Sequence, residues 1–229
     1  MVKNNTDTIK IAFLIPFFLF SFVLICGCTS TPSIPAPSAK TILYADNLSQ
    51  WRDEWHPEYD GPQGKIFYSG GSLHIRDNRP PESDVLQTLN KNFNDFILDI
   101  DATLIDGAND SWQGVIVRSP DSYNFYDFSI SGNGYYLVRK QEYGNLIIGR
   151  IVYFVDPTRS SSIKKGIGAT NHIQIEANGN SLSFSVNGHH LTTITDNKFR
   201  EGNIGLIVGS MLPNSFAEVA FSNLTITTL

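Results

Sequence analysis

From residue 172 to residue 194 the sequence reads HIQIEANGNSLSFSVNGHHLTTI, which is its clearest indication of a fold. Apolar and polar residues alternate there in three short blocks, as they do in strands that bury one face and expose the other. The pairs Asn178-Gly179 and Asn187-Gly188 separate the blocks. Asn-Gly is a strong signal for a two-residue hairpin turn, because both central residues adopt positive φ. The stretch therefore predicts a three-stranded antiparallel meander.

The same alternation continues on both sides of the meander. In 96–104 the apolar residues face one side, while Asp99 and Asp101 face the other. A change of parity after Phe221 predicts a bulge near Ser222-Asn223. Further strands are predicted at 114–118, 123–130, 135–140, 146–154, 202–209 and 216–227. About a dozen strands without repeats or a long amphipathic helix predict an all-β protein, a two-sheet antiparallel β-sandwich of the jelly-roll type.

The N-terminal segment has the pattern of an export signal. Residues 1–10 are polar and carry two lysines, and 11–25 form an uncharged apolar run. The run ends in Leu24-Ile25-Cys26-Gly27-Cys28, which resembles the lipobox of prokaryotic lipoprotein signal peptides. The resemblance implies that residues 1–27 are removed and that Cys28 is lipidated. An uncleaved signal anchor is the alternative, and both leave the following domain outside the cytoplasmic membrane.

The remainder divides into a tether and a domain. Residues 28–40 are rich in Ser, Thr and Pro, which predicts an extended tether, and 41–229 form the predicted sandwich. Lipidation would anchor this domain to the outer face of the cytoplasmic membrane or to an outer membrane. The formal net charge of −5 disfavours nucleic acid as a partner, because phosphates require a basic surface. Cys26 and Cys28 both precede the domain, so we expect no disulfide in it.

Six strings in the domain carry a resemblance to a known superfamily. They are NFNDFILDID (92–101), GVIVR (114–118), YNFYDFSI (123–130), VNG (186–188), GNIGL (202–206) and VAFSNL (219–224). Together they resemble the concanavalin A-like lectin/glucanase superfamily, nearest to its laminin G-like and keto-disaccharide-hydrolase-like (DUF1080) domains. The resemblance covers about residues 41–229 and implies a concanavalin A-like sandwich. Because these strings describe strands and turns, they say little about activity.

The sequence favours a non-catalytic domain. Some members of the superfamily are glucanases that cleave with two glutamates, in a pattern like Glu-x-Asp-x-x-Glu. The nearest string here begins at Asp99 and has Leu104 in place of the third carboxylate. We therefore interpret Asp99 and Asp101 as solvated strand residues. The sequence lacks a Gly-x-Ser-x-Gly motif, and the adjacent His189 and His190 would point to opposite faces of a strand, so they cannot easily share one metal ion.

One acidic loop has the composition of a calcium site. Asp106, Asn109 and Asp110 follow the predicted strand 96–104 and offer the oxygen ligands that Ca²⁺ prefers. Asp and Asn are also common in any turn, so a purely structural turn is the alternative. The sequence therefore specifies no cofactor: calcium held by these three residues is one interpretation of the loop, and a purely structural turn is the other.

A set of aromatic residues and one arginine is the predicted sugar-contacting set. Sugar binding requires aromatic faces for stacking beside polar side chains that fix hydroxyl groups. The candidates are Trp51, Trp55, Trp112, Arg118, Tyr123 and Tyr143. The alternative is that these aromatic side chains cover sheet edges or complete the core, which is the commoner fate of a tryptophan.

Three functions are compatible with these observations. The preferred one is a membrane-tethered, extracellular binding domain without catalytic activity, whose ligand is a carbohydrate or a surface glycan. The second is a glycoside-cleaving enzyme of the keto-disaccharide hydrolase type, which the resemblance supports and the missing acid pair opposes. The third is a structural or adhesive surface domain with a protein partner. The sequence leaves the oligomeric state open.

Overall fold

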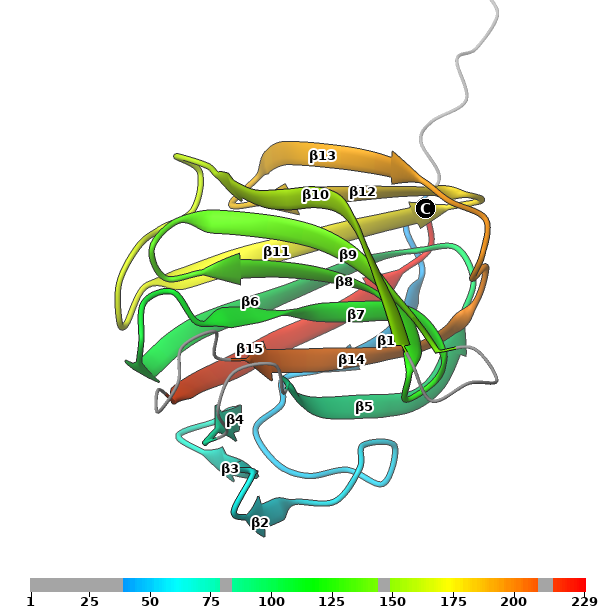
Figure 1. Ribbon diagram of the computed structural model, residues 1–229. Helices are drawn as coiled ribbons and strands as arrows, with labels where there is room; N and C mark the ends of the chain where they lie inside the picture. Colours follow the sequence, from blue (N-terminus) through cyan, green and yellow to red (C-terminus); the bar gives the residue numbers. More distant parts are fainter. Residues whose placement is uncertain (1–38, 79–83, 144–148, 210–215) are drawn as a thin grey trace, which may run out of the picture. The chain divides into compact units, whose positions relative to one another are not determined.

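The computed structural model describes residues 39–78, 84–143, 149–209 and 216–229 (Figure 1). The predicted signal peptide, Cys28 and nearly all of the predicted tether fall on residues 1–38, outside the described residues. Across the described ranges, no helix has the length and apolar character needed to cross a bilayer. The account below therefore concerns the second of the chain's two compact units, Ala39–Leu229.

The described residues form two antiparallel sheets, so the predicted β-sandwich is confirmed. The nine-stranded sheet has the order β13-β12-β11-β6-β15-β4-β3-β2, with β1 paired to β15, and the six-stranded sheet has the order β10-β9-β8-β7-β14-β5. The first sheet contains β1 (Ile42–Asp46), β2 (Tyr59–Gly61), β3 (Gly64–Ser69), β4 (Ser72–Asp77), β6 (Phe96–Gly107), β11 (Thr170–Asn178), β12 (Ser181–Val186), β13 (His189–Thr195) and β15 (Ala217–Thr227). The second contains β5 (Asp84–Phe93), β7 (Trp112–Asp121), β8 (Asn124–Ser131), β9 (Tyr135–Tyr143), β10 (Gly149–Arg159) and β14 (Gly202–Gly209).

The two sheets pack through their apolar inner faces. Phe128 of β8 and Phe184 of β12 are fully buried and stack with their ring centroids 4.9 Å apart, which joins the six-stranded sheet to the nine-stranded one. Burying a side chain of this size contributes about 1.5–3 kcal/mol. The alternation that predicted the strands therefore has its physical cause in this shared core.

Two local predictions are confirmed. β11, β12 and β13 form the expected meander, and Asn187 adopts φ of 52° in the second hairpin turn. Its side-chain oxygen accepts a hydrogen bond from the backbone N–H of His172 at 3.0 Å, so the asparagine both turns the chain and ties the hairpin to β11. The pairing of β15 with β6 shifts register between Ser222 and Thr225, where the bulge was expected.

The strands before residue 96 were not predicted. Four of these, β1 to β4, have only three to six residues each, which is too short for a periodic pattern to emerge. Part of the segment between β1 and β2 pairs with β5, the edge strand of the six-stranded sheet: Trp55 forms an isolated bridge with Leu89. This segment covers one edge of the six-stranded sheet.

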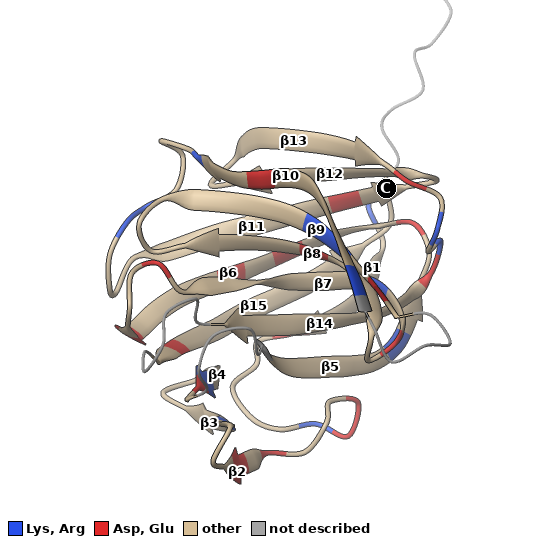
Figure 2. Ribbon diagram, in the orientation of Figure 1, with Lys and Arg blue, Asp and Glu red and all other residues tan. Residues whose placement is uncertain are grey.

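The outward side of the six-stranded sheet, here called the front face, is the surface that matters for function. Figure 1 shows this sheet in front of the nine-stranded one. Directly opposed residues on paired strands point to the same face of a sheet. One row across β14, β7, β8, β9 and β10 consists of Gly205, Ile116, Asp127, Arg139 and Tyr153. Figure 2 shows long parts of this sheet without any charged residue. Asp127 of β8 and Arg139 of β9 are among the charged residues that the sheet does carry, and they lie opposite each other.

Candidate functional site

Two of the predicted aromatic residues meet at one end of the front face. Tyr123 lies in the turn between β7 and β8, and Tyr143 ends β9; their side chains are exposed, and their ring centroids lie 5.4 Å apart. The backbone N–H of Tyr143 donates to the side-chain oxygen of Asn124 at 2.8 Å, which ties the end of β9 to this turn. The fold thus brings together two tyrosines that are distant in the sequence.

Two further apolar side chains extend this exposed surface. Ile151 and Tyr153 of β10 lie opposite Gln141 and Arg139 of β9, so they point to the front face. Together with Tyr123 and Tyr143 they form what we call the tyrosine patch, whose four residues are 41% to 61% exposed. Large apolar side chains gathered on one exposed face mark binding surfaces more often than isolated ones do. Sequence reasoning missed Ile151 and Tyr153, although both lie in a predicted strand.

A buried ion pair lies beside the patch in the same sheet. Asp127 is fully buried; Arg139 donates from Nε to one of its carboxylate oxygens at 2.5 Å, and Ser129 donates from Oγ to the other at 2.6 Å. Gly114, opposite Ser129, makes room, since a Cβ there would lie 2.3 Å from the serine hydroxyl. A buried carboxylate needs such partners because desolvation of a charge is costly.

Sequence reasoning did not identify this ion pair. The available signal was the polar series Asp127, Ser129 and Ser131, which alternates with core residues along β8. Only the pairing of β8 with β9 reveals that Arg139 lies opposite Asp127.

Two of the predicted sugar-contacting residues are buried, which corrects the expectation for them. Trp55 is only 2% exposed and donates from Nε1 to Asp46 at 3.1 Å. Arg118 is fully buried and donates to the backbone oxygen of Asn94 and to Asp95, both at 3.2 Å. Burial lowers the pKa of Arg118, and the charge of Asp95 partly offsets this effect. Neither side chain is available to a ligand at the surface.

The two other predicted tryptophans lie apart from the tyrosine patch. Trp112 points to the front face opposite Ser131, but at the end of β7 away from Tyr123. Trp51 lies outside the named strands, is 45% exposed, and donates from Nε1 to the backbone oxygens of Trp55 and His56. The structure therefore joins Tyr123 to Tyr143 but not to either tryptophan.

The acidic loop after β6 shows the geometry of a turn. Asp106 accepts a hydrogen bond from the backbone N–H of Gly107 at 2.8 Å, and Gly107 adopts φ of 105°. In the part of the chain that the structure describes, no group of three or more His, Cys, Asp and Glu side chains is arranged so that it could hold a metal ion. Aspartate side chains in turns commonly accept hydrogen bonds from nearby backbone N–H groups, so the contact of Asp106 with Gly107 agrees with the interpretation of this loop as a structural turn. The observed geometry gives no specific support for calcium at Asp106, Asn109 and Asp110.

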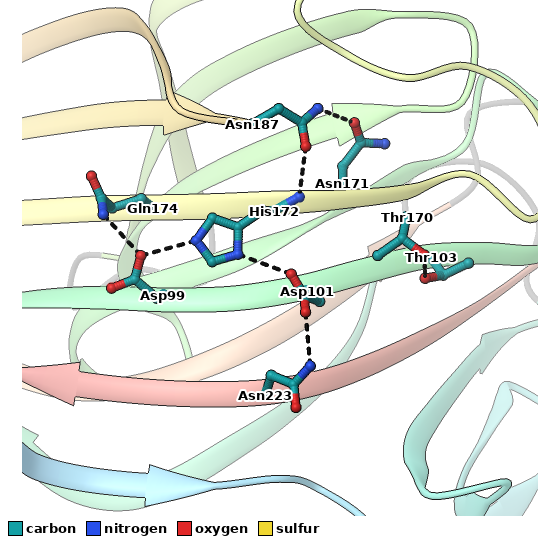
Figure 3. A network of polar contacts seen from close by, with 9 residues as sticks. All are labelled: Asp99, Asp101, Thr103, Thr170, Asn171, His172, Gln174, Asn187 and Asn223. Carbon is teal, nitrogen blue, oxygen red and sulfur yellow. Dashed lines mark hydrogen bonds and ion pairs between the residues drawn. The ribbon is translucent and has the colours of Figure 1, made fainter.

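A second polar cluster lies on the outward side of the nine-stranded sheet (Figure 3). His172 of β11 lies between two aspartates of β6, with Nδ1 2.9 Å from Asp101 and Nε2 3.0 Å from Asp99. Gln174 donates to Asp99 and Asn223 donates to Asp101, each at 2.8 Å. Asp99 and Asp101 are therefore partly buried and bound by neighbours, which corrects their interpretation as solvated residues.

The two aspartates control the protonation of His172. Partial burial alone would lower the pKa of His172, but the hydrogen bonds that its ring donates to Asp101 and Asp99, together with the charges of these carboxylates, raise the pKa above its ordinary value of 6.5. A raised pKa in the folded state stabilises the fold below the unfolded pKa, and that contribution is lost as pH rises through the folded pKa. The cluster therefore links the stability of the nine-stranded sheet to pH.

The change His172→Gln tests this linkage. We expect wild type to exceed the variant in unfolding free energy by about 0.2–1 kcal/mol at about pH 5.5, the range for partly exposed ion pairs. The difference should shrink toward about pH 9, where wild-type His172 is neutral. Urea unfolding across this range measures it, with His190→Gln on β13 as the exposed control. A difference that is constant with pH would contradict the assignment.

The solved structures with similar folds include proteins that are named for carbohydrate binding or glycoside hydrolysis. A carbohydrate binding module, CBM66 from Bacillus subtilis, matches with a TM-score of 0.58 and 18% identity, over 76% of this chain and 96% of that one. A glycoside hydrolase family 16 endo-glucanase from Bacteroides ovatus matches with a TM-score of 0.58 and 11% identity, and the match covers 81% of this chain and 100% of that one. LamA from Z. galactanivorans, in complex with laminaritriose and laminaritetraose, matches with a TM-score of 0.56 and 11% identity, and the match covers 82% of this chain and 99% of that one. At such identities the likeness shows the fold alone. No curated protein matches the chain.

The family comparison is more specific than the structural one. The model of the 3-keto-alpha-glucoside-1,2-lyase-like domain matches residues 39–227. The match begins near β1 and ends with the last residue of β15, so it takes in both sheets of the sandwich. It confirms the resemblance to keto-disaccharide-hydrolase-like domains that the strand and turn motifs carry. The chain therefore belongs to the 3-keto-alpha-glucoside-1,2-lyase-like domain family.

Proposed function

We propose that this domain binds saccharides at the tyrosine patch of the front face. The observation that carries the proposal is the meeting of Tyr123 and Tyr143, with exposed rings 5.4 Å apart. Ile151 and Tyr153 continue the apolar surface, and Gln141 points to the same face. A sugar ring has apolar C–H faces and a polar rim, so aromatic faces beside amide and charged groups suit its chemistry.

The family and the fold support a saccharide as the ligand class. The family is named for an activity on 3-keto-alpha-glucosides. One protein with a similar fold is named as a carbohydrate binding module, and another was solved with laminari-oligosaccharides. These names describe other proteins, and they support the proposal because the same sandwich presents an exposed aromatic surface here.

Binding without cleavage is the function that the front face supports best. A general base must reach the proton that it removes, directly or through one water. Asp127 is fully buried and engaged by Arg139 and Ser129, so its carboxylate is poorly placed for that task. The front-face geometry thus favours the non-catalytic alternative.

Family membership makes a lyase the second candidate. Elimination across C1 and C2 of a 3-keto-glucoside would remove the C2 proton, which the neighbouring ketone acidifies, and break the C1–O bond, whose oxygen takes up a proton. This would require a base on the front face to be uncovered. Release of the aglycone alcohol from a 3-keto-alpha-glucoside by the purified protein would establish the lyase, and an unchanged substrate would favour binding alone.

Substitutions in the tyrosine patch test the proposed binding. We expect Tyr123→Ala and Tyr143→Ala each to weaken binding about tenfold, which corresponds to about 1.4 kcal/mol. Calorimetry with laminaritetraose, maltotetraose and a mixed-linkage glucan tetrasaccharide measures the change. Ile167→Ala is the matched control, because Ile167 is a similarly exposed apolar residue outside the six-stranded sheet. Equal affinity in wild type and both tyrosine variants, or no binding by wild type, would sink the proposal.

We further propose that the domain is exported and held at the outer face of a membrane by a lipid on Cys28. The support is the lysine-containing start, the apolar run and the lipobox-like string before Cys28. Incorporation of labelled fatty acid into wild type but not into Cys28→Ser would support the tether. Equal labelling of both proteins would contradict it.

A further inference from the structure

A hollow lies at the edge of the six-stranded sheet, beyond the tyrosine patch. Its volume is ≈ 430 Å³, within the range of small-ligand pockets. Residues from 56–66, residues 85–88 of β5 and Ser122 line it. The backbone N–H of His56 donates to the oxygen of Thr88 at 3.3 Å, and Gln87 donates from Nε2 to the oxygen of His56 at 2.7 Å. These bonds hold the wall against β5, so the hollow is built before any ligand arrives.

The lining has the mixed chemistry that a sugar ring requires. Ile66, Val85 and Leu86 supply apolar surface, while Glu58 and Gln63 supply polar groups. Gln87 is fully buried and donates to the backbone oxygen of His56, so its role is to hold the wall of the hollow rather than to contact a ligand.

The hollow adjoins the tyrosine patch at the turn between β7 and β8. Ser122 lines the hollow, and the next residue, Tyr123, belongs to the patch, so their Cα atoms are about 3.8 Å apart. Asp121 fixes this turn, because its carboxylate accepts from the backbone N–H of Tyr123 at 2.8 Å and from the side chain of Asn124. The hollow and the tyrosine patch therefore meet at consecutive residues of one turn.

The strand order places a barrier at one end of the route from the tyrosine patch toward β5. The sheet runs from β10 through β9, β8, β7 and β14 to β5, and the segment around His56 pairs with the outer edge of β5. A saccharide that extends from the patch toward β5 therefore meets residues 56–59 as a wall.

We propose that the hollow holds the terminal ring of a saccharide chain whose following rings lie on the tyrosine patch, so that the domain recognises chain ends. The inference rests on the proposed function and deepens it. Recognition of an end rests on residues 56–59, which line the hollow and would stand in the way of a chain that continued past them. A domain with the patch alone would bind the interior of a polymer equally well.

The test varies the number of chain ends at constant mass. Two glucans are used, linear β-1,3-glucan and amylose, and each is prepared intact and after partial acid hydrolysis. Each preparation competes with a labelled fragment of the same glucan for binding to the wild-type protein. We expect the hydrolysed form of the bound glucan to compete at about tenfold lower mass than the intact form. Equal competition by both forms would overturn end recognition while leaving binding at the patch in place.

A variant that fills the hollow separates the two proposals. Thr88→Trp places a large ring at its lining on β5 and should abolish the preference for hydrolysed glucan, with an unfolding midpoint near that of wild type showing that it folds. Tyr123→Ala should weaken binding of both forms. Retention of the end preference in folded Thr88→Trp would refute the inference alone, whereas no binding of either glucan by wild type would remove the proposed function and the inference with it.

Trp51 supplies a second readout that does not depend on competition. A smaller hollow of ≈ 320 Å³, lined by Trp51, Pro57 and Glu58, shares its last two residues with the larger one. Titration with the hydrolysed glucan should change the indole fluorescence of wild type and should have little effect in Trp51→Phe. Loss of the change is expected in Thr88→Phe, which also fills the hollow but adds no indole, and its persistence there would contradict occupation of the hollow.

Discussion

Replacing Arg139 by methionine is expected to lower the free energy of unfolding by about 3–5 kcal/mol. Asp127 is fully buried, and Arg139 supplies a cationic hydrogen bond to its carboxylate at 2.5 Å. Removing one partner of a buried ion pair leaves a desolvated charge, and this penalty exceeds the worth of the pair itself. Urea unfolding at about pH 7 measures the loss. Arg139→Lys is the matched control, since it retains the charge and loses the planar guanidinium.

A double-mutant cycle identifies the cause of the loss. Asp127→Asn with Arg139→Met removes both charges and should recover part of the stability, because the buried carboxylate and the guanidinium that faces it are then removed together. Additive effects of the two single changes would mean that the residues act independently. That outcome would refute the interpretation of Asp127 and Arg139 as one unit in the front face.

Replacing Trp55 by alanine is expected to cost about 3–5 kcal/mol of unfolding free energy, as for other buried aromatic side chains. The Trp55 indole is 2% exposed and donates to Asp46, whose carboxylate also accepts from the backbone N–H of Leu48 at 2.8 Å. Trp55→Phe keeps a ring and loses the donor, so we expect an intermediate loss of about 1–3 kcal/mol. Thermal or urea unfolding measures both variants.

Trp51→Ala is the control for Trp55, because both tryptophans lie in the same short segment and Trp51 is 45% exposed. We expect less than about 1 kcal/mol for it, as for most surface positions. Similar losses for the two tryptophans would contradict the assignment of Trp55 to the core. A carbohydrate affinity unchanged in folded Trp55→Phe would agree with the burial of its side chain.

The two outward faces of the sandwich serve different roles in this account. The front face carries the exposed tyrosine patch, while the nine-stranded sheet carries the polar cluster around His172. Titration of His172 should therefore change stability without changing saccharide affinity. An affinity that follows the protonation of His172 would show that the faces are coupled.

The features that could be predicted from the sequence are those with a local cause. Alternation reports which side of a strand is buried, because successive side chains point to opposite faces. Asn187-Gly188 specifies its own turn through positive φ, and the bulge near Ser222-Asn223 follows from a change of parity in the same strand. Each signal lies within a few residues of the structure that it predicts.

The candidate site could be predicted only in part, since it depends on contacts between strands distant in the sequence. Tyr123 and Tyr143 were among the predicted sugar-contacting residues and are exposed. Trp55 was predicted with them on the same grounds, but it lies in the core. Nothing in the sequence near Asp127 indicates that Arg139 is its partner. Strand order and register decide which side chains share a face, and both are set by packing of the whole sandwich rather than by neighbouring residues.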